Sequence, residues 1–302
     1  MKRMIVVAAI AVMAGGMGGY LAQARGPLLP PFVPPATRDY EGHLARVKQT
    51  LPTQDAFVAL TVEPYAVFAD LNSDELKTAR RTITWAASHL RGDFFDRDPD
   101  RLIDIFIFKD QDSYAANSKE ILHNDNPDPF GFATSTAIAV NWPKGGGTLV
   151  REMVHPYMAA NFPKCPVWFE QGLAALYEES TDKGGHIVGL TNWRLALLQE
   201  NLRGKWPNDE GPAPAFEALC AMNAETFNGK TNMSNVNTAR YLLFYMQERD
   251  ILRDYFQKLL KNQKTDPTGY DTLQKGLAAA GDTDMVKFRR KWEGWVLTLT
   301  YP

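Results

Sequence analysis

Short apolar runs separated by one long helical pattern characterise the first half of the chain. Residues 56–69 are rich in Val, Phe and Tyr and predict one or two strands. Residues 102–108 (LIDIFIF) predict a short, largely buried strand, and residues 136–141 (TAIAVN) predict another short strand. Ser73 can cap a helix over residues 75–90. The first half is therefore expected to contain a small mixed sheet together with helices.

The second half has the 3.6-residue apolar period of helices almost throughout. A run of three glycines (Gly145, Gly146 and Gly147) separates the last predicted strand from the first of these helices, and Thr148 can cap that helix. The predicted helices cover residues 149–161, 168–179, 192–202, 235–248, 251–261, 270–280 and 284–299. We therefore expect the α+β class, with an α+β lobe over residues 56–162 and a helical lobe over residues 163–302.

The N-terminus has the pattern of a bacterial-type export signal. A basic start (Met1–Arg3) precedes an uncharged apolar run over residues 4–22, and Ala22-Gln23-Ala24 forms a cleavage site. The sequence predicts a signal peptide over residues 1–24 and a periplasmic or extracellular protein; the alternative is an uncleaved membrane anchor. Five prolines in residues 26–35 then predict an extended tether within a lead-in over residues 25–55.

Composition excludes several classes of protein. Of the 302 residues, 45% are hydrophobic and 23% are charged, which is typical of globular proteins and not of disordered ones. The net charge of −2 provides no basic excess for nucleic-acid binding. Two cysteines cannot form a four-cysteine zinc site. In an oxidising compartment Cys165 and Cys220 could form a disulfide, or they could be two buried thiols.

One helical segment carries a degenerate metal motif. Zinc metallopeptidases use H-E-x-x-H on a helix, where two histidines four residues apart bind the metal and the glutamate activates a water. The matching stretch here runs from Arg151 through Glu152 to His155. The glutamate and the second histidine are present, and arginine replaces the first histidine.

The surrounding sequence resembles the secreted bacterial gluzincin-type metallopeptidases, the peptidase MA-like group with a thermolysin-like zincin core. The resemblance is strongest in GGGTLVREMVHP (145–156) and FPKCPVWFEQGLAALYE (162–178), and GLTNWRL (189–195) and ARYL (239–242) are also similar. It covers the chain from about residue 57 to the C-terminus. It implies a zincin-like fold, Glu152 at the general-base position, and metal-ligand positions at Arg151, His155 and Gln171.

Two of these three ligand positions are unsuited to zinc. A guanidinium has no free lone pair, so Arg151 cannot bind the metal. The neutral amide of Gln171 is a poorer zinc ligand than the carboxylate that the family has there. We therefore predict no bound cofactor. Substitute ligands are the alternative: Glu170, which would need a turn of about 100° around its helix, or a distant histidine (His43, His89, His123 or His186).

Without zinc, Arg151 is expected to pair with Glu152 and Glu170 and so hold two helices together. The resemblance places a peptide groove between the two halves of the chain. Its expected walls are the strand over residues 136–141, which could pair with an extended peptide, and the side chains of Tyr157, Trp168, Arg240 and Tyr241. The alternative for Trp168 and Tyr241 is a core position.

The sequence thus favours a non-catalytic pseudopeptidase that binds a peptide or an envelope protein. The alternative is an active zinc metallopeptidase that uses a substitute ligand, with Glu152 as general base. A glycosidase with Glu152 and Glu170 as its carboxylate pair is a weaker interpretation, because Arg151 favours an ion pair there. No nucleic-acid partner is expected, and membrane association is expected only if the signal segment is uncleaved.

Overall fold

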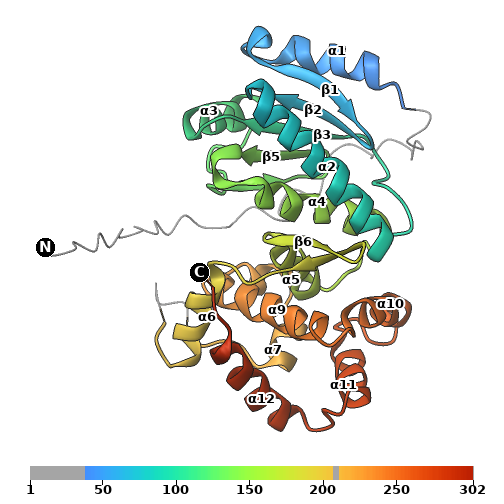
Figure 1. The fold of residues 1–302 in the computed structure, drawn as a ribbon, viewed down its shortest axis with the longest axis vertical. Coiled ribbons are helices and arrows are strands. Elements are labelled where there is room, and N and C mark those ends of the chain that lie inside the picture. Colours follow the sequence, from blue (N-terminus) through green and yellow to red (C-terminus); the bar gives the residue numbers. More distant parts are fainter. Residues whose placement is uncertain (1–37, 207–210, 302) are drawn as a thin grey trace, which may run out of the picture.

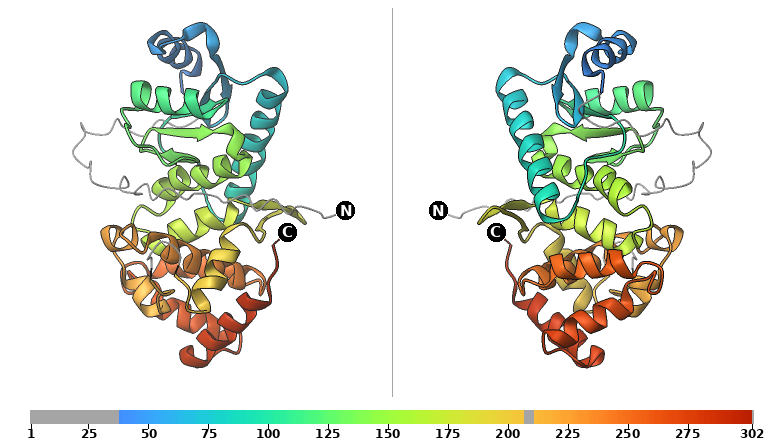
Figure 2. Two further views of the ribbon diagram at one scale, coloured as in Figure 1. Left: turned by 90° about the vertical axis from the view of Figure 1, so that its left-hand side faces the viewer. Right: turned by 90° about the vertical axis from the view of Figure 1, so that its right-hand side faces the viewer.

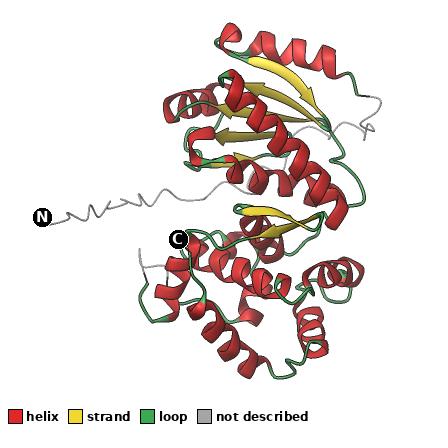
Figure 3. Ribbon diagram, in the orientation of Figure 1, coloured by secondary structure: helices red, strands yellow, loops and turns green. Residues whose placement is uncertain are grey.

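The computed structural model describes residues 38–206 and 211–301, so the predicted signal peptide and the proline-rich stretch lie outside the described residues. A sheet with its covering helices forms one half of the molecule, and a helical assembly forms the other (Figures 1 and 3). This arrangement confirms the predicted α+β class, with the sheet in the N-terminal half and helices dominating the C-terminal half. One hydrophobic core runs through both halves, from Val62 to Val296.

The sheet is mixed and has the strand order β1-β2-β3-β5-β4. β2, β3 and β5 are parallel neighbours, while β1 and β4 pair antiparallel at the two edges. The strands β2 and β5 are buried at every position, which explains their continuous apolar sequences. The strands are β1 (Val58–Val62), β2 (Tyr65–Ala69), β3 (Ile103–Phe108), β4 (Gly131–Ala133) and β5 (Ala137–Asn141).

Helices cover both faces of this sheet, because successive strand residues point to opposite sides. Val67 and Ile105 pack in the core formed with α2 (Ser73–Asp93) and α4 (Gly146–Asn161). Phe68 and Phe106 face a second core, beneath α1 (Tyr40–Thr50) and α3 (Gln111–Leu122). The layers are visible in the side views of Figure 2. Neither α1 nor α3 is among the helices predicted from the sequence, and α1 lies within the predicted lead-in over residues 25–55.

Two predicted helix caps are wrong. Asn72, and not Ser73, caps α2: its side chain accepts hydrogen bonds from the backbone of Asp74 and Glu75, and the Glu75 carboxylate accepts one from the Asn72 backbone. The helix α4 begins at Gly146, so Thr148 lies inside it and caps nothing.

The C-terminal half is built around α9, which is buried along nearly its whole length and packs against α5. Gly172 of α5 allows this approach, since a Cβ there would lie 3.0 Å from the Ala239 Cβ of α9. The helices are α5 (Val167–Tyr177), α6 (Arg194–Leu202), α7 (Phe216–Ala221), α8 (Ala224–Phe227), α9 (Asn232–Gln247), α10 (Leu252–Asn262), α11 (Tyr270–Ala279) and α12 (Met285–Thr298).

A hairpin interrupts the predicted run of helices. The strands β6 (Ser180–Lys183) and β7 (His186–Gly189) pair antiparallel between the two halves of the molecule (Figure 1). Gly184 and Gly185 have φ angles of +65° and +84°, the left-handed conformations that a tight two-residue hairpin turn needs at both positions. The helices predicted from the sequence leave residues 180–191 unassigned, and the hairpin lies in this gap.

Cys165 and Cys220 are free thiols, so the structure does not contain the disulfide considered from the sequence. Burial raises the pKa of both thiols, which disfavours the reactive thiolate form. Among the helices in the described part of the chain, none is both long and apolar enough to cross a membrane.

Candidate functional site

The motif residues lie on two buried helices that pack against each other. The helix α4 carries Arg151, Glu152 and His155, and it continues through Pro156. The helix α5 carries Glu170 and Gln171. Residues three or four apart on a helix share one side, so Arg151 and His155 lie on one side of α4 with Glu152 next to them. The two helices meet where the sheet half joins the helical half (Figure 1).

Arg151 and Glu152 form a buried ion pair. Arg151 Nη1 donates a hydrogen bond to Glu152 Oε1 over 2.9 Å, and the two side chains are 7% and 1% exposed. A carboxylate that accepts a charge-assisted hydrogen bond is held in place and is stabilised in its ionised form. The sequence prediction that Arg151 pairs with Glu152 is confirmed. Glu152, at the position that the resemblance assigns to a general base, partners a guanidinium.

His155 links α4 to α5. Its Nδ1 lies 2.8 Å from Glu170 Oε1, and its Nε2 lies 3.9 Å from Glu152 Oε2. Glu152 therefore has one oxygen on Arg151 and the other directed toward the imidazole. The expectation that Glu170 pairs with Arg151 is not met by these contacts, because the Glu170 carboxylate binds His155. The interhelical contact is made by an imidazole and a carboxylate.

The donor set does not fit a catalytic zinc ion. Such a site needs three protein ligands that each offer a lone pair, plus one open position. The guanidinium of Arg151 offers none and adds a positive charge, while Gln171 offers a neutral amide. One oxygen of the Glu170 carboxylate is hydrogen-bonded to His155 Nδ1. Within residues 38–206 and 211–301, no set of three His, Cys, Asp or Glu side chains is arranged to hold a metal ion.

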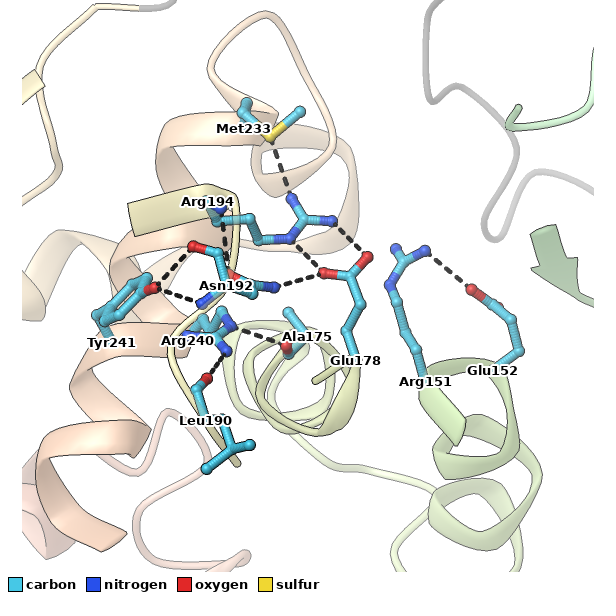
Figure 4. A network of polar contacts seen from close by, with 10 residues as sticks. All are labelled: Arg151, Glu152, Ala175, Glu178, Leu190, Asn192, Arg194, Met233, Arg240 and Tyr241. Atoms are coloured by element: carbon cyan, nitrogen blue, oxygen red, sulfur yellow. Dashed lines mark hydrogen bonds and ion pairs between the residues drawn. The ribbon is translucent and has the colours of Figure 1, made fainter. Parts of the chain in front are cut away.

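A second buried network continues from this site into the helical half (Figure 4). Glu178, just after α5, accepts hydrogen bonds from Arg194 Nε over 2.8 Å and from Asn192 Nδ2 over 3.0 Å. Arg151 lies between Glu178 and Glu152 in Figure 4. Burial opposes ionisation of Glu178, but the positive charges of Arg194 and Arg151 outweigh it and hold the pKa of Glu178 below its usual value. Glu178 is therefore a carboxylate shared between the two halves.

Glu178, Asn192 and Arg194 are not among the site residues predicted from the sequence. The sequence gives one indication that they belong to the site: all three lie in the segments 162–178 and 189–195, which resemble the gluzincin-type metallopeptidases. A charged residue in an apolar helical segment is rarely fully buried unless it is paired. Their pairing depends on contacts between distant segments, which a linear pattern does not display.

Two of the four expected groove residues, Arg240 and Tyr241, lie in the core. Arg240 is fully buried and donates hydrogen bonds to the carbonyl oxygens of Ala175 and Leu190. Burial lowers the pKa of Arg240 to about 10. The Tyr241 hydroxyl contacts the backbone of Asn192. Both side chains join α9 to neighbouring segments and form no wall of a groove.

Tyr157 and Trp168 are also fully buried. The Tyr157 hydroxyl donates to Asp98 Oδ1 over 3.1 Å, and the Trp168 indole donates to the Thr268 carbonyl over 2.9 Å. Buried aromatic side chains with a polar group commonly find such partners. The expectation that these side chains line an open groove is wrong in this structure, and the alternative of core packing holds for Trp168 and Tyr241.

The strand expected to receive a peptide lies inside the sheet. β5 is hydrogen-bonded to β3 on one side and to β4 on the other, so it has no free edge. Strand addition requires an exposed edge. The prediction that residues 136–141 pair with a peptide is therefore wrong for this conformation.

Of the four histidines considered as substitute ligands, three pair with carboxylates outside the motif, and His123 is the C-cap residue of α3. His43 binds Asp104, His89 binds Asp182 and His186 binds Asp93, each over 2.6 Å. A cavity of about 840 Å³ is lined by the β6–β7 hairpin, α10 and the end of α9, and neither Glu152 nor His155 lines it. This cavity and the motif residues are therefore separate features.

Comparison with models of known protein families and with curated proteins gives no match to this chain.

Proposed function

We propose that this chain is an exported, peptidase-derived protein with a zincin-like fold that acts by binding and not by peptide cleavage. The motif R-E-x-x-H and the following W-F-E-Q-G support the derivation. Their helices pack against each other where the two halves of the chain meet, which is compatible with a former site between two lobes. The partner class that we propose is a peptide or an envelope protein.

The observation that carries this proposal is the buried ion pair between Arg151 and Glu152. A general base must accept a proton from an activated water in a site that water can reach. The Glu152 side chain is 1% exposed and is hydrogen-bonded to a cation that stays charged. The burial of Glu152 and its contact with Arg151 favour a structural role for its carboxylate over the role of a general base.

A reversion experiment tests the proposal. The double variant Arg151→His/Gln171→Glu restores the ligand types that the resemblance implies, so it should bind about one zinc ion per chain while the parent binds little. Gln171→Glu alone is the matched control, since it leaves Arg151 in place and should not bind zinc. Circular dichroism confirms that each variant is folded. A folded double variant that binds no zinc would contradict the zincin derivation.

One observation favours the second candidate, an active metallopeptidase with a substitute ligand. Glu170, a possible substitute ligand, reaches His155. This alternative predicts zinc binding and peptidase activity in the parent chain, with the activity lost in Glu152→Gln. A casein or peptide-library assay on the zinc-equilibrated parent and on Glu152→Gln separates the two functions.

Export is a separate part of the proposal. Residues 1–24, fused to a reporter enzyme that is active only outside the cytoplasm, should export the reporter and so make it active. Replacing Lys2 and Arg3 with Glu should abolish export of the fusion, because the basic start of the signal is then lost. A reporter that stays inside the cell with the native residues 1–24 would contradict this part.

A further inference from the structure

Two imidazole–carboxylate pairs connect the β6–β7 hairpin to α2. His89 Nε2 of α2 lies 2.6 Å from Asp182 Oδ2 of β6. His186 Nδ1 of β7 lies 2.6 Å from Asp93 Oδ1 at the end of α2. The pairs are reciprocal, because α2 supplies the histidine of one and the carboxylate of the other. Both pairs lie near the hairpin turn.

The two ends of the hairpin are attached differently. At its base, Gly189 exchanges two hydrogen bonds with the Gln247 side chain, and the Ile187 amide donates to Asp93 Oδ2. The tip, residues 181–186, is exposed, and its turn is Gly184-Gly185. A hairpin of two short strands is marginally stable by itself. The histidine pairs therefore hold the tip against α2.

The hydrogen bonds of His89 specify its protonation state. Its Nδ1 lies 2.8 Å from the Trp85 carbonyl oxygen, and its Nε2 faces the Asp182 carboxylate. A carbonyl oxygen and an ionised carboxylate only accept hydrogen bonds, so both ring nitrogens must donate. Only the imidazolium ion has two N–H groups. The observed contacts thus require a protonated His89.

The tip also forms one wall of the cavity of about 840 Å³. Asp182, Lys183 and His186 line this cavity from the hairpin, and Leu252 and Arg253 line it from α10. A tip that leaves α2 would change the shape of this cavity and its access to solvent.

We infer that His89 is a proton-controlled latch that holds the hairpin tip against α2 and thereby controls access to this cavity. When His89 loses a proton, the ring keeps one N–H, and the other nitrogen presents a lone pair to an oxygen acceptor. In either neutral tautomer the charge attraction to Asp182 is lost: a proton kept on Nδ1 leaves the Nε2 lone pair facing the carboxylate, and a proton kept on Nε2 leaves only the hydrogen bond of a neutral ring. The attachment of the tip to α2 is then weakened.

Asp182 on β6 and Asp93 on α2 favour the imidazolium. On the other elements nearby, the His186 ring of β7 and the Arg253 guanidinium of α10 both face the Asp93 carboxylate. Burial lowers the pKa of His89, but the hydrogen bonds to Asp182 and the Trp85 carbonyl outweigh this, so its pKa is raised above the usual 6.5. The stabilising contribution of the latch is therefore complete below pH 6.5, as long as Asp182 stays ionised, and is lost as the pH rises through the higher pKa of the docked state.

The test combines a titration of His89 with amide hydrogen exchange of the tip in the full folded chain. Ring ¹⁵N shifts report the protonation of His89, and exchange protection of residues 181–186 reports docking, over about pH 5.5 to 9. The exchange protection of residues 181–186 should fall over the pH range in which His89 loses its proton. The total fall should be about tenfold for each pH unit by which docking raises the pKa of His89. Amides of β3 provide the reference for global stability.

Two variants assign the transition. His89→Gln should give a tip whose protection no longer changes with pH, and the matched variant His186→Gln should keep the transition of His89. A transition that survives in His89→Gln, or that disappears in His186→Gln while β3 stays protected, would overturn the assignment to His89. A His89 ring that is neutral at about pH 6 would also overturn it.

Discussion

Arg151 Nη1 donates a hydrogen bond to Glu152 Oε1 over 2.9 Å, and both side chains are at least 93% buried. The pair stands at the first ligand position and the general-base position of the metallopeptidase motif that the sequence resembles. A buried ion pair is costly to form but more costly to break, because the remaining charge has no compensation. The stability of the buried part of α4 therefore depends on both partners.

Replacing Arg151 with Ala should lower the free energy of unfolding by about 3–5 kcal/mol, since Glu152 would be left as a buried charge. The double variant Arg151→Ala/Glu152→Ala should recover part of this loss, because no isolated charge remains. Equilibrium urea unfolding of the parent and the variants measures both effects. An unchanged midpoint for Arg151→Ala would show that the pair has no structural role.

Glu178 should make stability depend on acid pH. Its pKa in the folded chain is below the usual 4.5, where the positive charges of Arg194 and Arg151 outweigh the effect of burial. The unfolded chain then takes up the proton more readily, so the contribution is complete above pH 4.5 and is lost as the pH falls through the folded pKa. Glu178→Gln should be less stable at pH 7 by about 3–5 kcal/mol.

The same variant should show a smaller loss of stability between pH 5 and pH 3 than the parent, because its side chain does not titrate. Urea unfolding at a series of pH values measures the difference. If the parent and the variant lose the same amount of stability between pH 5 and pH 3, Glu178 does not contribute to the acid sensitivity.

The three consecutive glycines before the motif should respond differently to substitution. A Cβ on Gly147 would lie 1.8 Å from the Glu178 carbonyl oxygen, whereas a Cβ on Gly146 meets nothing closer than 3.6 Å. Gly147→Ala should destabilise the protein by about 1–3 kcal/mol or more, because backbone must move. Gly146→Ala, its matched control, should be neutral or stabilise by up to about 1 kcal/mol through helix propensity. Thermal unfolding of both variants tests this, and equal melting temperatures would contradict it.

Periodicity was informative where an element has a strong pattern of its own. The predicted helix over residues 270–280 and the observed α11 (Tyr270–Ala279) differ by one residue, and the strand over residues 102–108 matches β3 closely. The helix α1 was missed because a proline-rich stretch precedes it, although Asp39 caps it and Leu44 and Val47 pack against the second core. The β6–β7 hairpin was missed because its tip is polar and its strands have four residues each.

The candidate site was only partly predictable for a different reason. Residue spacing on one helix correctly placed Arg151 beside Glu152. Spacing along one helix does not show which of its residues a side chain from another helix contacts. The contact of Glu170 with His155 therefore could not be predicted from the sequence. The helix α9 is buried on nearly all sides, and therefore a polar residue such as Arg240 does not mark a solvent-facing surface. Tertiary packing decided these positions.

The most direct test of the central claim is the zinc content of the mature parent protein, expressed without tags, equilibrated with dilute zinc and measured by mass spectrometry. We expect less than about a tenth of an equivalent, since Arg151 and Gln171 supply no suitable ligands. Near-stoichiometric zinc would contradict a non-catalytic protein and would favour the metallopeptidase with a substitute ligand.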